Sequence, residues 1–241
     1  MKSKSITILF LIFSLLVFSQ QKTSDLIATG KKQQAKGEFK SAIKSFSQAI
    51  AASPNESEAY YYRGNAYFDL NKFDDAIADY SKCYSLNPEN LDAIFNRGNT
   101  WYEKANYTKA IEDLTTILGK KPKYADAFFL RGNSYYAINK FDKALNDLNS
   151  GLLLDQKNAD GYYDRANTFF KLNKFEDALV NFDKAIELDA TDYNYFFNRA
   201  ITKFNLDANA DGCSDLRKAE ELGDADANYY IMELCGSSSI N

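Results

Sequence analysis

Small residues and proline recur along this chain at a constant interval of 34 residues. All three prolines obey it, at Pro54, Pro88 and Pro122. Glycine or alanine follows the same interval in two further series, Gly30, Gly64, Gly98, Gly132, Ala166 and Ala200, and Ala42, Ala76, Ala110, Ala144, Ala178 and Gly212. A period of this length predicts stacked structural repeats, because one unit alone cannot bury its apolar face. We set six repeats at residues 23–56, 57–90, 91–124, 125–158, 159–192 and 193–226.

Each repeat has the pattern of two amphipathic helices. In the second repeat, residues 59–70 carry apolar side chains at helical spacing, and Asn71-Lys72 forms a polar, turn-like break. A second helical stretch begins at Phe73 and runs to residue 86, where Asn87-Pro88 ends it because proline cannot continue a helix. The chain is therefore predicted to be all-α.

The residue types at fixed positions of the period resemble the tetratricopeptide repeat. Small residues stand at the eighth, twentieth and twenty-seventh positions, aromatic residues at the fourth, eleventh and twenty-fourth, and proline at the thirty-second. The second repeat shows the pattern best, with Tyr60, Gly64, Tyr67, Ala76, Tyr80, Cys83 and Pro88. The resemblance covers about 204 of the 241 residues. It implies a right-handed α–α superhelix of antiparallel helix hairpins.

The terminal repeats depart from this pattern. The first has Gln33 where an aromatic residue is expected, and the sixth has Lys203 there and Asn209 in place of another aromatic residue. Atypical ends are expected, because terminal repeats cap the stack. Residues 227–241 are predicted to form a C-terminal capping helix and tail.

The first 19 residues have the order of a secretory signal peptide. Lys2 and Lys4 precede an uncharged run at residues 6–18, and Ser19 supplies a small residue for cleavage. The run is shorter than the roughly 20 residues of a membrane-spanning helix. We expect an exported protein, periplasmic or secreted, with no membrane span in the mature chain. An uncleaved N-terminal anchor is the alternative.

Composition excludes several classes of function. The chain has no histidine, so it cannot form a Ser-His-Asp or Cys-His catalytic pair or an HExxH zinc site. Lys2 and Lys4 account for two of its 29 basic residues, which leaves 27 against 33 acidic residues in the body. An acidic body disfavours nucleic acid as a partner. No segment outside the repeats could hold a catalytic domain, so we expect no enzyme activity, no cofactor and no metal.

The family resemblance implies a concave surface built from the first helix of each repeat. The fifth, ninth and twelfth positions share a helix face and combine aromatic residues with a row of asparagines. The predicted groove residues are Tyr61, Asn65, Phe68, Phe95, Asn99, Tyr102, Phe129, Asn133, Tyr136, Tyr163, Asn167 and Phe170. Asparagine can both donate to and accept from a peptide backbone. The alternative is that these aromatic residues pack between helices. Acidic residues at the second position, such as Glu58 and Asp92, favour a neutral or basic ligand.

A second row pairs arginine with an acid or an amide 16 residues later. Its arginines are Arg63, Arg97, Arg131, Arg165 and Arg199, and their counterparts are Asp79, Asp113, Asp147, Asn181 and Asp215. The first repeat lacks both members, with Thr29 and Ser45. This joint absence predicts contact across each hairpin in a structural pair. A row of anion-binding arginines is the alternative.

The cysteines and one acidic segment raise two further possibilities. Cys83 replaces an alanine of other repeats and is predicted to be a buried thiol. Cys213 and Cys235 would be brought together by antiparallel helices and are predicted to form a disulfide. Residues 207–212 match the opening of a calcium loop, D-x-N-x-D-G, but Lys218 stands where such a loop needs glutamate, which favours a polar turn.

These features favour a non-catalytic scaffold that binds a protein or peptide segment along its concave side. A carbohydrate-binding module of the cell envelope is one alternative, since aromatic and asparagine side chains also suit sugars. A docking subunit for a catalytic partner is another.

Overall fold

The computed structural model describes residues 20–236, and all regular structure within this range is helical. The predicted all-α fold is therefore confirmed. The predicted signal peptide and the last five residues lie outside the described residues. The chain divides into two compact units, residues 1–117 and residues 118–241, and we describe each by itself.

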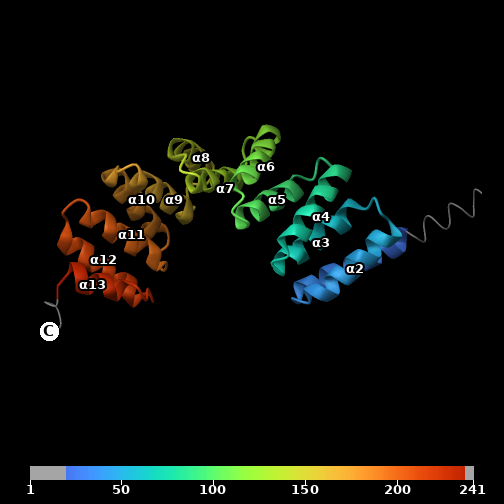
Figure 1. Ribbon diagram of the computed structural model, residues 1–241, viewed down its shortest axis with the longest axis horizontal. Coiled ribbons are helices and arrows are strands. Elements are labelled where there is room, and N and C mark those ends of the chain that lie inside the picture. The colour runs from blue at the N-terminus through green and yellow to red at the C-terminus, as the bar shows by residue number, and fades with distance from the viewer. Residues whose placement is uncertain (1–19, 237–241) are drawn as a thin grey trace, which may run out of the picture. The chain divides into compact units, whose positions relative to one another are not determined.

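Unit 1 is a succession of helices in which chain neighbours pack against each other (Figure 1). Residues 20–35 are helical. The helices that follow are α2 (Phe39–Ala52), α3 (Ser57–Asp69), α4 (Phe73–Leu86), α5 (Leu91–Glu103) and α6 (Tyr107–Lys120), whose last residues cross the unit boundary.

Unit 2 continues the same arrangement. Its helices are α7 (Ala125–Ala137), α8 (Phe141–Leu154), α9 (Ala159–Lys171), α10 (Phe175–Leu188), α11 (Tyr193–Phe204), α12 (Asn209–Glu221) and α13 (Ala227–Leu234). None of the helices in residues 20–236 has both the length and the apolar character needed to cross a membrane.

The turn inside each hairpin uses a left-handed residue at the fifteenth position of the repeat. These residues are Gly37, Asn71, Ala105, Asn139, Asn173 and Asp207, with φ between 56° and 74°. Glycine, asparagine and aspartate adopt this conformation more readily than other residues. The two helices of a hairpin are thereby reversed at the same point in every repeat.

The two helices of a hairpin meet where the eighth position is small. In the second repeat a Cβ atom on Gly64 would lie 2.8 Å from the ring of Tyr80, so this approach requires glycine. Tyr80 is 1% exposed and Cys83 is fully buried, as predicted for that thiol. The core of each unit therefore lies along the seams between successive helices.

The sixth repeat forms a hairpin although its sequence departs most from the pattern. Lys203, which replaces the expected aromatic residue, places its Nζ 2.8 Å from Oδ2 of Asp215. A disulfide joins Cys213 to Cys235, with the two Cα atoms 5.7 Å apart. The ring of Phe197 contacts Tyr230 of α13 at 5.1 Å between centroids. The last helix, α13, thus packs against the sixth repeat and is covalently linked to it by the disulfide.

Candidate functional site

The predicted groove residues are half-buried, except Phe129. Phe129 is 9% exposed, and its ring lies 2.6 Å from the position that a Cβ atom would take on Gly151 or on Gly161. This side chain therefore fills the space between α7, α8 and α9. It has the packing role that the sequence left as the alternative.

The aromatic residues at the twelfth position also contribute to packing. Phe68 contacts Phe73, the first residue of the next helix, with ring centroids 5.7 Å apart. The same contact recurs at 5.3 to 5.5 Å in three other repeats, in the pairs Tyr102–Tyr107, Tyr136–Phe141 and Phe170–Phe175. These rings therefore pack within their own hairpins, and each remains partly exposed at the surface.

The asparagine row is largely engaged between repeats. Oδ1 of Asn65 accepts hydrogen bonds from the Tyr80 hydroxyl at 2.8 Å and from Nδ2 of Asn96 at 2.9 Å. Nδ2 of Asn96 also lies 3.3 Å from the Tyr61 hydroxyl. Because Asn96 belongs to the following repeat, these bonds fix one repeat against the next. We call Tyr61, Asn65 and Asn96 the unit-1 clamp.

A second clamp of the same composition lies in unit 2. Nδ2 of Asn198 bonds Oδ1 of Asn167 at 3.1 Å and the hydroxyl of Tyr163 at 2.8 Å. Between the fourth and fifth repeats, Nδ2 of Asn133 donates to Oδ2 of Asp164 at 2.7 Å. The asparagines were predicted as ligand contacts, and these bonds give them a positioning role as well.

The sequence reasoning missed the sixth position of the repeat, which supplies the partner of each of these asparagines. That position holds Tyr62, Asn96, Leu130, Asp164 and Asn198 in successive repeats, so the 34-residue period hides it. A longer period reveals it, because the triplet Phe-Asn-Arg at residues 95–97 returns at residues 197–199, three repeats later.

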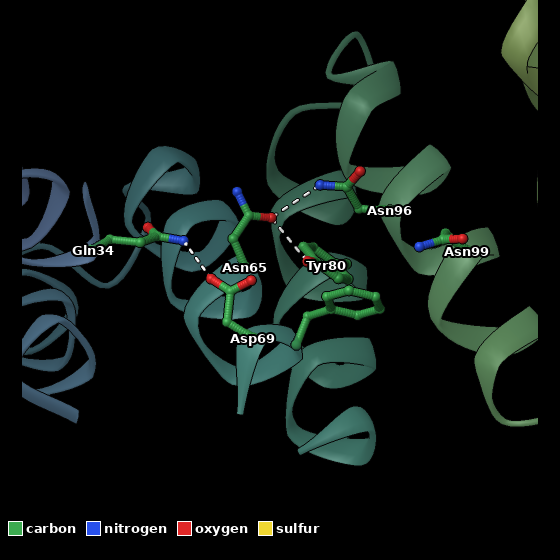
Figure 2. A pocket seen from close by; sticks show the side chains of 7 residues that line it. Gln34, Asn65, Asp69, Tyr80, Asn96 and Asn99 are labelled. Atoms are coloured by element: carbon green, nitrogen blue, oxygen red, sulfur yellow. Dashed lines mark hydrogen bonds between the residues drawn. The ribbon is translucent and has the colours of Figure 1, made fainter. Parts of the chain in front are cut away.

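Two residues of the unit-1 clamp, Asn65 and Asn96, line a cavity of about 290 Å³. Figure 2 shows the amide and carboxylate groups of helices 20–35, α3 and α5 facing this space. The lining residues are Gln34, Asn65, Phe68, Asp69, Tyr80, Asn96 and Asn99. We call this cavity the unit-1 cup. It contains three of the predicted groove residues, Asn65, Phe68 and Asn99.

Hydrogen bonds hold the walls of the unit-1 cup in place. Nε2 of Gln34 donates to Oδ2 of Asp69 at 3.2 Å, which links the first repeat to the second. The amide nitrogen of Asn65 points away from its two bonded partners, and the Asn99 amide makes no bond to the other residues drawn (Figure 2). Burial, with the neighbouring Tyr61 and Asp69, raises the pKa of Tyr80 above its ordinary value, so this phenol stays protonated.

The unit-2 cup occupies the equivalent place three repeats later, with a volume of about 170 Å³. It is lined by Tyr136, Asn167, Phe170, Lys171, Phe182, Asn198 and Ile201. Each lining residue lies 102 residues after its counterpart in the unit-1 cup. The two cups therefore share the two clamp asparagines and a phenylalanine, while Asp69 is replaced by Lys171 and Asn99 by Ile201.

The arginine row is committed to bonds between helices. Nε and Nη2 of Arg97 bond the two carboxylate oxygens of Asp113 at 2.8 and 2.6 Å. Arg63, Arg131 and Arg199 make the same two-point contact with Asp79, Asp147 and Asp215, and Arg165 bonds Asn181 at 2.7 Å. Pairing across the hairpin is as predicted. These guanidinium groups are structural rather than open to an anion.

Neither a metal centre nor a calcium loop is assembled in the part of the chain that the structure describes. Among residues 20–236, no three His, Cys, Asp or Glu side chains lie close enough to hold a metal ion. Asp207 occupies the hairpin turn with a φ of 59°, and α12 begins at Asn209. Residues 207–212 therefore form a turn and a helix start.

Comparisons with known proteins agree on the repeat architecture. A tetratricopeptide repeat model matches residues 57–90 and 159–192, and a second TPR repeat model matches residues 30–71 and 132–173. Together they cover about half of the chain in two blocks, residues 30–90 and 132–192, whose equivalent positions lie 102 residues apart. No curated protein sequence matched the chain.

Solved structures with the same fold include three proteins of low sequence identity to this chain. PilF of Pseudomonas aeruginosa has a TM-score of 0.75 and 15% identity, over 89% of this chain and 99% of that one. MamA of Desulfovibrio magneticus RS-1 has a TM-score of 0.67 and 19% identity, over 70% and 96%. YrrB, described as a TPR protein with an unusual peptide-binding site, has a TM-score of 0.64 and 20% identity, over 78% and 98%.

Proposed function

Because this chain belongs to the tetratricopeptide repeat family, whose members bind proteins or peptides, we propose that it is a non-catalytic scaffold for a protein segment. The segment would lie along the first helices of the repeats, where the predicted groove residues are half-buried. The work done is binding and orientation, without any bond being made or broken.

The observation that carries this proposal is the unit-1 cup. Its amide, carboxylate and aromatic side chains converge from three repeats on a space of about 290 Å³. Ligand sites in proteins are concave and use a small number of placed polar groups to fix the orientation of what they bind. The peptide-binding site for which YrrB is described supports a peptide as the ligand class.

Export to the periplasm or the cell exterior is a further part of the proposal. It rests on the signal-peptide order of residues 1–19 and gains support from the Cys213–Cys235 disulfide, since such bonds persist in oxidising compartments. The intact mass of the protein recovered from outside the cytoplasm tests this part. A mass that retains Met1 would overturn cleavage.

The binding proposal is tested with a double variant, Asp69→Ala with Asn99→Ala, because both residues line the cup and neither is buried. Phe129 is unsuitable as a target, since its loss would empty the core. The double variant and the unchanged protein are compared for binding to envelope proteins and to envelope polysaccharide. The control is Asp142→Ala, an exposed residue of α8, which is the second helix of its repeat and lies outside the cup lining.

Loss of a defined protein partner by the double variant alone is the expected result. Loss of polysaccharide binding with proteins unaffected would favour the carbohydrate module. Equal binding by all three proteins would overturn a function for the cup.

A further inference from the structure

We propose that the unit-1 cup is a site for a cationic side chain, lysine or arginine, carried by the bound segment. This inference rests on the proposed function and deepens it by naming the chemistry of one anchor. The charge of the cup, its aromatic surface and its difference from the unit-2 cup all favour such a ligand.

The lining of the unit-1 cup offers acceptors and one negative charge. Asp69 stands at its wall, and no lysine or arginine is among its lining residues. Nε2 of Gln34 donates to Oδ2 of Asp69. Oδ1 has no hydrogen-bond partner among the described residues, and the residue is exposed. Asn99 and Gln34 add neutral amide groups to the lining. A positively charged group would be attracted by Asp69, whereas a carboxylate would be repelled by it.

The aromatic residues of the cup favour the same ligand. Phe68 and Tyr80 both line it, but Tyr80 is 1% exposed, so the half-buried Phe68 ring supplies the aromatic surface that a ligand can reach. An ammonium or guanidinium group near an aromatic face is attracted by the negative face of the ring. The alkyl stem of lysine or arginine would meanwhile cover apolar ring surface.

The unit-2 cup provides an internal comparison. It keeps the Asn167–Asn198 clamp and an aromatic residue at each equivalent position, but Lys171 replaces Asp69, Ile201 replaces Asn99, and Tyr136 replaces Gln34. The same frame therefore carries a positive charge and fewer acceptors. The unit-2 cup would repel the cation that the unit-1 cup attracts. The charge at the position of Asp69 and Lys171 therefore gives the two cups different ligand preferences.

The test uses the purified protein and four short blocked peptides of sequence Gly-X-Gly, with X as Lys, Arg, Gln or Glu. Side-chain amide signals of Asn99 and Asn167, assigned by substitution, report on the two cups in a nuclear magnetic resonance titration. We expect the Lys and Arg peptides to shift the Asn99 signal saturably, with weaker binding as salt is raised. The Gln and Glu peptides should bind at least tenfold more weakly, as should every peptide at Asn167.

Two charge variants make the outcome decisive. Asp69→Asn keeps the shape of the exposed side chain and should weaken the Lys and Arg peptides about tenfold, while Lys171→Asp in unit 2 should leave the Asn99 response unchanged. Equal shifts by Gln and Lys peptides, or an unchanged response in Asp69→Asn, would overturn the inference. If the cation inference fails but the Asp69→Ala/Asn99→Ala variant loses its protein partner, the scaffold proposal stands and only the cation inference is overturned. If that variant keeps its protein partner, both the function proposed for the cup and the cation inference are overturned.

Discussion

At the scale of single residues, the arginine row shows how a repeated charge can serve the stack. Arg97 bonds both oxygens of Asp113 in its own hairpin, and its Nη1 donates to Ser81 of the preceding repeat at 2.9 Å. Asp113 is 6% exposed. One guanidinium therefore joins three helices, and removing its carboxylate would leave a partly buried charge without its counterion.

We predict that Asp113→Ala lowers the free energy of unfolding by about 3 kcal/mol, because breaking a buried pair strands the remaining charge. Asp74→Ala is the matched control. It removes the partner of Lys104, but the Asp74 side chain is 86% exposed, so the loss should be about 0–1 kcal/mol. Urea unfolding measures both, and equal effects in the two variants would contradict the structural role of the row.

Asp164 predicts an unusual dependence of stability on pH. Burial raises the pKa of this carboxyl from 3.8 to about 6, although the hydrogen bond from Asn133 opposes the shift. The folded state therefore binds the proton more tightly than the unfolded state, and this contribution to stability is present below pH 4 and is lost as pH rises through about 6.

Asp164→Asn keeps the shape of the side chain and removes the titration. We expect the variant to be more stable than the unchanged protein at pH 8, by about 1–2 kcal/mol, with the difference shrinking towards pH 4. Chemical unfolding of both proteins across this range gives the result. A difference that does not change with pH would show that Asp164 is not shifted upwards.

At the scale of helices and hairpins, the eighth position distinguishes required from tolerated glycines. A Cβ atom on Gly64 would lie 2.8 Å from the Tyr80 ring, whereas one on Gly98 would meet its nearest atom, Cβ of Asp113, at 3.4 Å. The fifth and sixth repeats already carry alanine at this position.

We predict that Gly98→Ala is neutral or raises the free energy of unfolding by up to about 1 kcal/mol, because alanine is the better helix former. Gly64→Ala should lower it by about 1–3 kcal/mol through overpacking. Thermal unfolding compares them, and a stabilising Gly64→Ala would contradict the packing described for the second hairpin.

The C-terminal hairpin depends on its covalent link. Replacing Cys213 and Cys235 together by serine should lower the stability of α12 and α13 by roughly 3 kcal/mol, the chain-entropy value for a loop of this size. Hydrogen exchange measured helix by helix would locate the loss. Exchange that rises equally throughout residues 20–236 would argue against a local staple.

Much of this level of structure was predictable from sequence because the repeat fixes it locally. Asn71-Lys72 marks the turn between α3 and α4, and Asn87-Pro88 marks the end of α4. The Arg–Asp pairing was also accessible, since both members are missing from the first repeat. The clamps could not be predicted from the sequence. Asn65 is bonded by Asn96, which belongs to the next repeat and stands at a position whose residue type varies between repeats. Contacts between repeats depend on geometry that the 34-residue period does not encode.

At the scale of the whole molecule, a period of 102 residues overlies the shorter one. It relates the two clamps, the two cups and the two blocks matched by the family models. The clamp residues are kept across this interval, while the cup linings differ in charge. The chain thus carries two sites with similar surroundings but different chemistry, one in each unit.

The central claim, that a partner segment binds across the unit-1 cup, is tested most directly by site-specific photo-cross-linking. A photoreactive side chain is placed at position 99, on the wall of the cup, or at position 78, an exposed site of α4 outside its lining. The account predicts that position 99 cross-links to one contiguous segment of one partner, with a lysine or arginine near the linkage, and that position 78 does not. Cross-linking to that partner from position 78 but not from position 99 would contradict it.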